Sequence, residues 1–142
     1  MNTIAIIPAR GGSKGIPRKN VLNVAGKPLI VWTIEDALES KHVDGVFVST
    51  DDDEIAQVSE QAGAAVVRRP AEIAGDMTPS EAALLHTLDV VEAKHGTVDE
   101  VVFLQATSPI RTGADIDAAL ELFRKEKADS MVSVCAMHIF IW

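Results

Sequence analysis

Short apolar runs alternate with segments of helical periodicity along the whole chain. The runs are rich in Ile and Val and have the length of buried strands. They predict strands at residues 3–8, 46–50, 65–67, 100–105 and 130–135. Because a helical pattern separates each run from the next, the order predicts parallel strands joined by crossing helices.

Each helical segment has a start signal and one apolar face. Pro28 suits the first position of a helix, and Asp51 or Asp52 can cap the next one. Capping boxes are predicted at residues 78–81 and 112–115. The predicted buried faces, in chain order, are Ile30, Ile34, Ala37 and Leu38; Ile55, Val58 and Ala62; Leu84, Leu85, Leu88 and Val91; and Ile116, Leu120 and Phe123.

This order of elements predicts one fold class and one location for a ligand. The fold class is α/β, with a doubly wound, mostly parallel sheet in a three-layer α/β/α arrangement. Ligands of such sheets bind beyond the carboxyl ends of the strands. Residues 9–19, 49–53 and 106–111 are predicted at that edge, so a binding site is expected among them.

Charge is distributed unevenly along the chain. The net charge is −8, yet residues 1–34 hold five basic residues and no acidic one. An acidic chain with a local basic block favours a small anionic ligand over nucleic acid. No run is apolar and long enough for a membrane helix, no signal peptide is recognised, and the single cysteine, Cys135, has no partner in the chain. A cytoplasmic protein is therefore expected.

The basic block surrounds a glycine-rich loop that directly follows the first strand. Gly11 and Gly12 allow a sharp turn whose backbone N–H groups can bind an anion. Arg10 and Lys19 can add charge-assisted hydrogen bonds to phosphate oxygens, and Ser13 can donate its hydroxyl. The glycine spacing fits neither a Walker A loop nor a dinucleotide-binding fingerprint. We expect extended backbone from Pro17 to Gly26 rather than a helix at the glycines.

Three segments resemble the acylneuraminate cytidylyltransferases, the CMP-sialic acid synthetases. The first is Ile-Pro-Ala-Arg-Gly-Gly-Ser-Lys-Gly-Ile-Pro-Arg-Lys-Asn at residues 7–20, followed by Gly-Lys-Pro-Leu at 26–29. The second runs from Arg69 to Ser80, and the third is Leu-Gln-Ala-Thr-Ser-Pro-Ile-Arg at 104–111. Three long motifs in the family's order make the resemblance specific over residues 3 to 135.

The resemblance implies a Rossmann-like nucleotidyltransferase fold and a chemical activity. The family transfers CMP from CTP to the anomeric hydroxyl of a nine-carbon 2-keto acid sugar and releases pyrophosphate. Arg10, Ser13 and Lys19 would hold the triphosphate with the Gly11 and Gly12 backbone; Asn20, Arg69 and Ser80 would contact ribose and cytosine; and Gln105 would reach the sugar acid.

The resemblance also implies what lies beyond these residues. Family members use Mg²⁺, whose aspartate ligands lie in a later segment, so no metal ligand is expected within residues 1–142. The later segment also carries most of the sugar pocket and the contact of a homodimer. Residues 1–142 are therefore expected to form a single nucleotide-binding domain, truncated at its C-terminus relative to the family.

Three alternatives stay open. A CMP-KDO synthetase would use an eight-carbon acid, but that branch has Gly-Asp-Glu-Pro where this chain has Ala-Thr-Ser-Pro at 106–109. A non-catalytic CTP-binding fragment is a second alternative. A metabolite-binding module that dimerises through the apolar residues 138–142 is a third.

Several residues also have purely structural interpretations. Ser80 can be the second residue of a capped helix, and Arg69 can brace the turn at Pro70. Residues 51–53 favour helix capping over a metal site. Trp32 favours packing over base stacking, Cys135 is expected to be buried and inert, and the four histidines have no ligand spacing.

Overall fold

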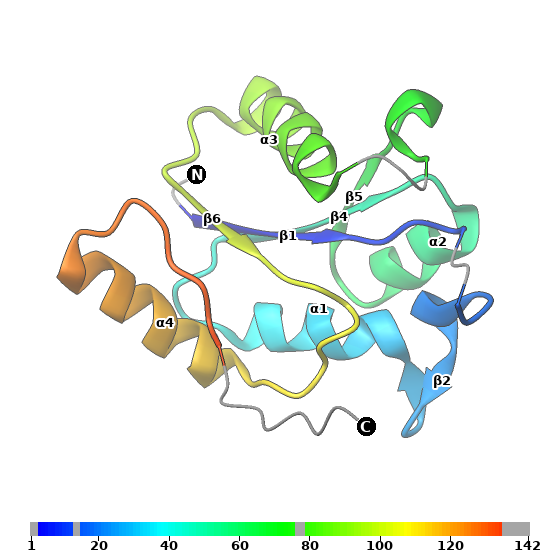
Figure 1. The fold of residues 1–142 in the computed structure, drawn as a ribbon, viewed down its shortest axis with the longest axis horizontal. Coiled ribbons are helices and arrows are strands. Elements are labelled where there is room, and N and C mark those ends of the chain that lie inside the picture. Colours follow the sequence, from blue (N-terminus) through cyan, green and yellow to red (C-terminus); the bar gives the residue numbers. More distant parts are fainter. Residues whose placement is uncertain (1–2, 13–14, 76–78, 135–142) are drawn as a thin grey trace, which may run out of the picture.

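The computed structural model describes residues 3–12, 15–75 and 79–134. Its centre is a sheet of four parallel strands in the order β5-β4-β1-β6 (Figure 1). The strands are β1 (Thr3–Pro8), β4 (Gly45–Thr50), β5 (Ala65–Arg68) and β6 (Glu100–Phe103). β1 lies in the interior of the sheet, with β4 on one side and β6 on the other.

Helices cover both faces of this sheet. α1 (Leu29–Glu39), α2 (Asp53–Gln61) and α4 (Gly113–Glu126) lie on one face, and α3 (Ser80–His95) lies on the other (Figure 1). The predicted three-layer α/β/α fold is confirmed. The remaining elements are short: the 3-10 turns η1 (Lys19–Val21) and η2 (Ala71–Ile73), and the hairpin of β2 (Asn23–Val24) and β3 (Lys27–Pro28).

The core divides into two clusters because β1 is buried on both faces. Ala5 and Ile7 pack with α1, α2 and α4, whereas Ile4 and Ile6 pack with α3. Successive side chains of a strand point to opposite faces, so alternate residues of one apolar run supply both clusters. β1 thus joins the two halves of the core, as does β4 with Val48 in one cluster and Phe47 in the other.

The helix starts largely follow the predicted caps. The Asp52 side chain accepts a hydrogen bond from the Ile55 N–H at 2.9 Å, and Thr112 and Asp115 form a complete capping box at α4. α1 begins one residue after Pro28, whose extended ψ makes it the cap. α3 begins at Ser80, its first rather than second residue; Thr78 lies outside the described residues.

Two predicted core leucines are exposed. Leu38 in α1 is 48% exposed, and Leu85 in α3 is 62% exposed. The buried stripe of α3 is instead Ala83, Thr87 and Val91, spaced one turn apart. Only a narrow stripe of each helix contacts the sheet, so an apolar residue beside that stripe still faces solvent.

The expected strand at 130–135 is wrong over its described part. Residues 130–134 form no strand, Val132 and Val134 are 80% and 86% exposed, and Cys135 lies outside the described residues. An apolar run becomes a strand only where another backbone pairs with it, and this segment makes no ladder with β6. β6 also ends two residues earlier than expected, although the Leu104 N–H still donates to the Ile6 carbonyl at 3.0 Å.

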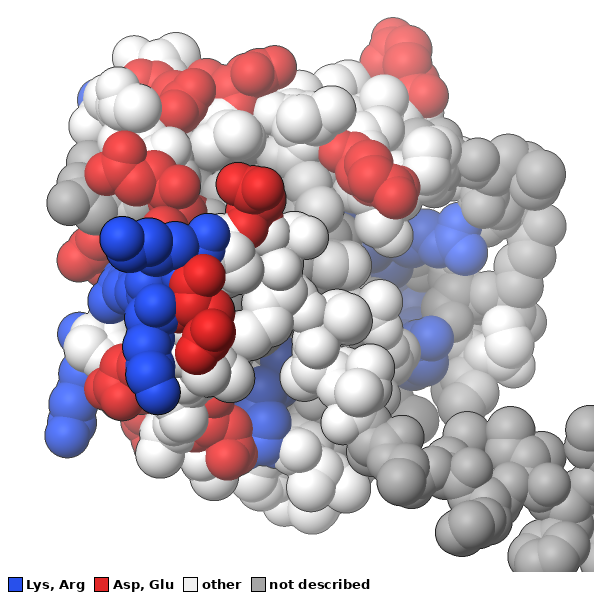
Figure 2. Space-filling model, turned by 60° about the vertical axis from the view of Figure 1, so that its left-hand side comes forward, with Lys and Arg blue, Asp and Glu red and all other residues white. Residues whose placement is uncertain are grey.

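Acidic and basic side chains are mixed on the face that Figure 2 shows, and the described residues drawn there form no broad surface of a single sign. One ion pair, between Arg124 of α4 and Glu100 of β6, ties a helix to the sheet. The Thr3 hydroxyl completes it by donating to Glu100 Oε2 at 2.7 Å. No helix of the described residues is long and apolar enough to cross a membrane.

Glu100→Gln is expected to lower the free energy of unfolding by about 1 kcal/mol at neutral pH. Hydrogen bonds from Arg124 lower the pKa of Glu100 from 4.5 to about 2. The carboxylate therefore stabilises the fold fully above about pH 4.5 and loses that effect as the pH falls toward about 2. Urea unfolding at several pH values should show wild type and variant converging in acid. A difference that is independent of pH would contradict this account.

Candidate functional site

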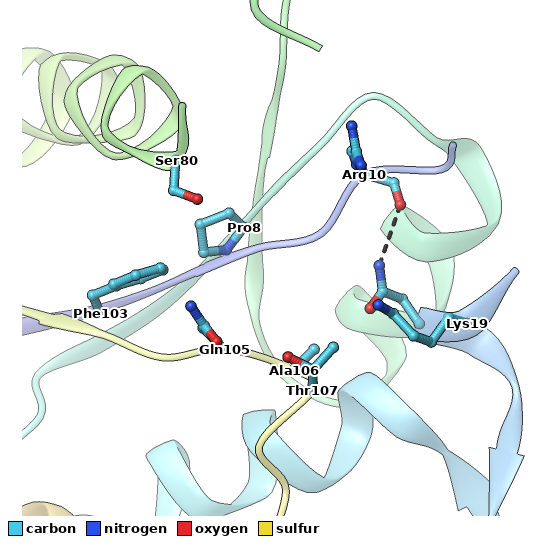
Figure 3. A pocket seen from close by; sticks show the side chains of 9 residues that line it. Pro8, Arg10, Lys19, Ser80, Phe103, Gln105, Ala106 and Thr107 are labelled. Carbon is cyan, nitrogen blue, oxygen red and sulfur yellow. Dashed lines mark hydrogen bonds between the residues drawn. The ribbon is translucent and has the colours of Figure 1, made fainter. Parts of the chain in front are cut away.

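A cavity of about 240 Å³ opens at the carboxyl edge of the sheet (Figure 3). It lies between the end of β1, η1, the first residue of α3 and the segment after β6. Its walls are formed by Pro8, Arg10, Lys19, Asn20, Ser80, Phe103, Gln105, Ala106 and Thr107. The predicted site residues Arg10, Lys19, Asn20, Ser80 and Gln105 are therefore brought together from three separate parts of the sequence.

The glycine-rich loop leaves β1 and returns to the cavity through η1. The Asn20 side chain is buried and donates from Nδ2 to the Arg10 carbonyl at 3.2 Å, the dashed line in Figure 3. This bond joins the two ends of the loop. The expected extended backbone from Pro17 to Gly26 is confirmed at β2 but wrong at residues 18–21, where Arg18 has a left-handed φ of 55° and the 3-10 turn η1 follows.

Gly11 lies beside the cavity, against the start of α2. Its N–H donates to Asp51 Oδ1 at 3.0 Å, so this donor of the expected anion-binding turn is occupied by a carboxylate. A Cβ at this position would lie 2.6 Å from Asp52 Oδ2, so only glycine fits. Gly12 is exposed and does not line the cavity, and Ser13 lies outside the described residues.

Arg69 does not line the cavity. Its Nη2 donates to the Ser49 carbonyl at 2.9 Å, and its Nε lies 3.3 Å from the Ser49 hydroxyl. Burial lowers the pKa of Arg69, and the nearby Asp51 opposes this shift. The guanidinium braces the end of β4 rather than the turn at Pro70, and its expected contact with the nucleotide stays a prediction.

The segment after β6 contributes residues that the sequence did not single out. Thr107 lines the cavity beside Gln105. Its position within the motif at 104–111 could have identified it as a candidate site residue. Arg111 holds this segment in place: Nη2 donates to the carbonyls of Gln105 at 2.8 Å and Ser108 at 2.6 Å, and lies 3.2 Å from the Thr33 hydroxyl.

Four of the five basic residues before Glu35 lie in the described part of the chain, and they have different roles; Lys14 lies outside it. Arg10 and Lys19 line the cavity. Arg18 pairs with Asp52 and Glu54, and Lys27 pairs with Glu35. The Lys27 ammonium also lies 3.8 Å from the Trp32 ring centroid, and the Trp32 indole donates to the Val24 carbonyl, so Trp32 packs on the hairpin as expected.

The described residues do not fit a metal site. They contain no group of three or more His, Cys, Asp or Glu side chains that could hold an ion. The described residues of the cavity wall include no carboxylate, and the neighbouring Asp51 and Asp52 are engaged by Gly11, Arg18 and the start of α2. Helix capping by Asp52 is confirmed.

Comparison with known proteins gives relatives over nearly the whole chain. The family model for cytidylyltransferases matches residues 4–138. The N-acylneuraminate cytidylyltransferase A of Danio rerio is 43% identical, covering 97% of this chain and 31% of the relative. A pseudaminic acid cytidylyltransferase of Campylobacter jejuni is 40% identical, covering 87% of this chain and 53% of the relative. The chain thus spans about a third to a half of these curated relatives.

A solved structure agrees with the fold. The CMP:2-keto-3-deoxy-manno-octonic acid synthetase complexed with CTP superposes with a TM-score of 0.73 and 27% identity, over 90% of this chain and 49% of that one. Fold, motif order and family model coincide: the chain belongs to the cytidylyltransferase family.

Proposed function

We propose that this chain provides the CTP-binding part of an enzyme that transfers CMP from CTP to a nonulosonic acid, giving CMP-sialic acid or a close analogue and pyrophosphate. The observation that supports this most directly is the convergence of Arg10 and Lys19 on one cavity with Asn20, Ser80 and Gln105. A triphosphate is the ligand class that suits two cations in a cavity whose described wall contains no carboxylate.

The reaction requires charge neutralisation more than covalent chemistry. The anomeric hydroxyl oxygen of the sugar bonds to the α-phosphorus, the bond from that phosphorus to the bridging oxygen breaks, and pyrophosphate leaves. The hydroxyl proton goes to solvent. Arg10 and Lys19 stabilise the negative charge that develops on pyrophosphate. Ser80, the first residue of α3, lies on the same wall and is proposed to contact the ribose and cytosine.

Mg²⁺ stays a prediction for the complete enzyme. It would neutralise further charge on the phosphates. Because the described residues supply no set of ligands for it, no step above depends on the metal. A homodimer and a cytoplasmic location likewise stay predictions from the sequence.

The proposed sugar is a nine-carbon acid rather than the eight-carbon KDO. The relatives named for N-acylneuraminate and pseudaminic acid are 43% and 40% identical, whereas the KDO-related synthetase is 27% identical. The sequence at 106–109 also departs from the KDO branch. Gln105, on the cavity wall, is the residue proposed to reach the sugar acid.

Calorimetric titration with CTP, and with UTP and ATP for comparison, tests the binding step. CTP is expected to bind most tightly, and absence of CTP binding would overturn the proposal. Pyrophosphate release is then measured with CTP, Mg²⁺ and N-acetylneuraminate, pseudaminic acid or KDO. Binding without turnover favours the second candidate, a non-catalytic CTP-binding fragment, whereas preference for KDO contradicts the nonulosonic acid assignment.

A further inference from the structure

Both ends of the glycine-rich loop are attached to the start of α2. At the first end, the Gly11 N–H donates to Asp51 Oδ1 at 3.0 Å. At the second end, Arg18 forms a bidentate pair with Asp52, with Nη2 to Oδ1 at 3.1 Å, and a further pair with Glu54. Neither Asp51 nor Asp52 lines the cavity. These acids therefore contact the loop on the side that faces away from the cavity.

Asp52 is a rigid support for these contacts. Its carboxylate caps α2 through the Ile55 N–H, and its own N–H donates to the Thr50 hydroxyl at 3.1 Å. Its Oδ2 lies 2.6 Å from the position that a Cβ of residue 11 would occupy, so the loop packs directly on it. Hydrogen bonds from Arg18 lower the pKa of Asp52, so the carboxylate stays charged at neutral pH.

Arg18 has an unfavourable backbone conformation. Its φ of 55° lies in the left-handed region, which costs free energy for a residue with a Cβ. The conformation comes immediately before Lys19 and Asn20 and starts the turn that directs both into the cavity. The Val21 N–H donates to the Arg18 carbonyl at 3.1 Å and the Asn20 side chain donates to the Arg10 carbonyl, and the ion pairs of the Arg18 side chain attach this turn further to the start of α2.

We propose that Arg18 and Asp52 are positioning residues: their ion pair holds the η1 turn so that Lys19 and Asn20 are preorganised for the nucleotide. This inference rests on the proposed function, because CTP is the ligand that reports the position of the turn. An isolated surface ion pair contributes little to stability. This one is expected to contribute more, because its geometry is bidentate and a second carboxylate takes part.

The variant Asp52→Asn distinguishes a role of the ion pair in holding the η1 turn from a purely electrostatic effect of the Asp52 charge on CTP binding. Asparagine caps a helix as well as aspartate, so α2 is preserved. Removing a negative charge near a triphosphate site would strengthen CTP binding if only long-range electrostatics mattered. If the ion pair positions the turn, CTP binding weakens instead, by about three- to tenfold. The two explanations predict opposite signs.

Asp53→Asn is the matched control. It removes the same charge from the same helix end, but the Asp53 side chain is 93% exposed and pairs with Arg68 rather than with the loop. CTP affinity is expected to be unchanged or slightly increased. In an Arg18→Gln background, Asp52→Asn should have no further weakening effect, since the pair is already broken.

Amide hydrogen exchange without nucleotide gives a second measurement. Residues 15–21 should exchange faster in Asp52→Asn and Arg18→Gln, and at the wild-type rate in Asp53→Asn. If wild type does not bind CTP, the proposed function fails. If wild type binds CTP, and Asp52→Asn binds it equally or more tightly with unchanged exchange, the positioning role alone is overturned.

Discussion

Lys19→Ala and Arg10→Ala are each expected to weaken CTP binding by about ten- to hundredfold. Both side chains line the cavity, and a charge-assisted hydrogen bond to a phosphate contributes about 1.5–3 kcal/mol. Calorimetry at one fixed salt concentration measures the change, because phosphate contacts are strongly salt-dependent.

Lys27→Ala is the matched control for these variants. It removes an equal charge from the same basic block, but Lys27 is engaged by Glu35 and the Trp32 ring outside the cavity. Its effect on CTP affinity should be below about threefold. Equal losses in Lys27→Ala and Lys19→Ala would show that only the overall charge matters, and that the cavity is not the phosphate site.

Ile34→Ala is expected to lower the free energy of unfolding by about 2–5 kcal/mol. Ile34 is 0% exposed and belongs to the cluster between the sheet and the helices α1 and α4. Truncation removes buried methyl groups and leaves a cavity that the surrounding sheet and helices cannot fill. Urea or thermal unfolding, followed by circular dichroism, measures the loss.

Leu38→Ala tests the same helix one turn further on. Leu38 is about half exposed, so its truncation should cost less than about 1 kcal/mol. The sequence pattern placed both residues on one apolar face, whereas the structure separates them. A loss for Leu38→Ala as large as that for Ile34→Ala would contradict the observed packing of α1.

The order and type of the main elements were predictable because periodicity and caps carry that information locally. The run at 3–8 became β1 with the expected bounds, and the Thr112–Asp115 capping box formed as predicted. The exposed side chains of Leu38 and Leu85 were not predictable in the same way. How wide a stripe a helix buries depends on its distance and angle to the sheet, which no local pattern encodes.

The candidate site was predictable where the sequence motifs lie at the carboxyl edge of the parallel sheet. Arg10, Lys19, Asn20, Ser80 and Gln105 were brought together as expected. Arg69 does not line the cavity, because its guanidinium donates to the Ser49 carbonyl instead. The left-handed Arg18 was missed as well, since arginine gives no signal for that conformation.

The central position of β1 has a consequence for how the proposed nucleotide would enter and leave. Residues 4–7 of this strand are fully buried, while residues 15–18 of the loop that follows it are exposed. Fluctuations that release the loop therefore need not disturb the strand beneath it, because local opening costs far less than global unfolding. Entry and departure of the proposed nucleotide would then leave the scaffold folded throughout.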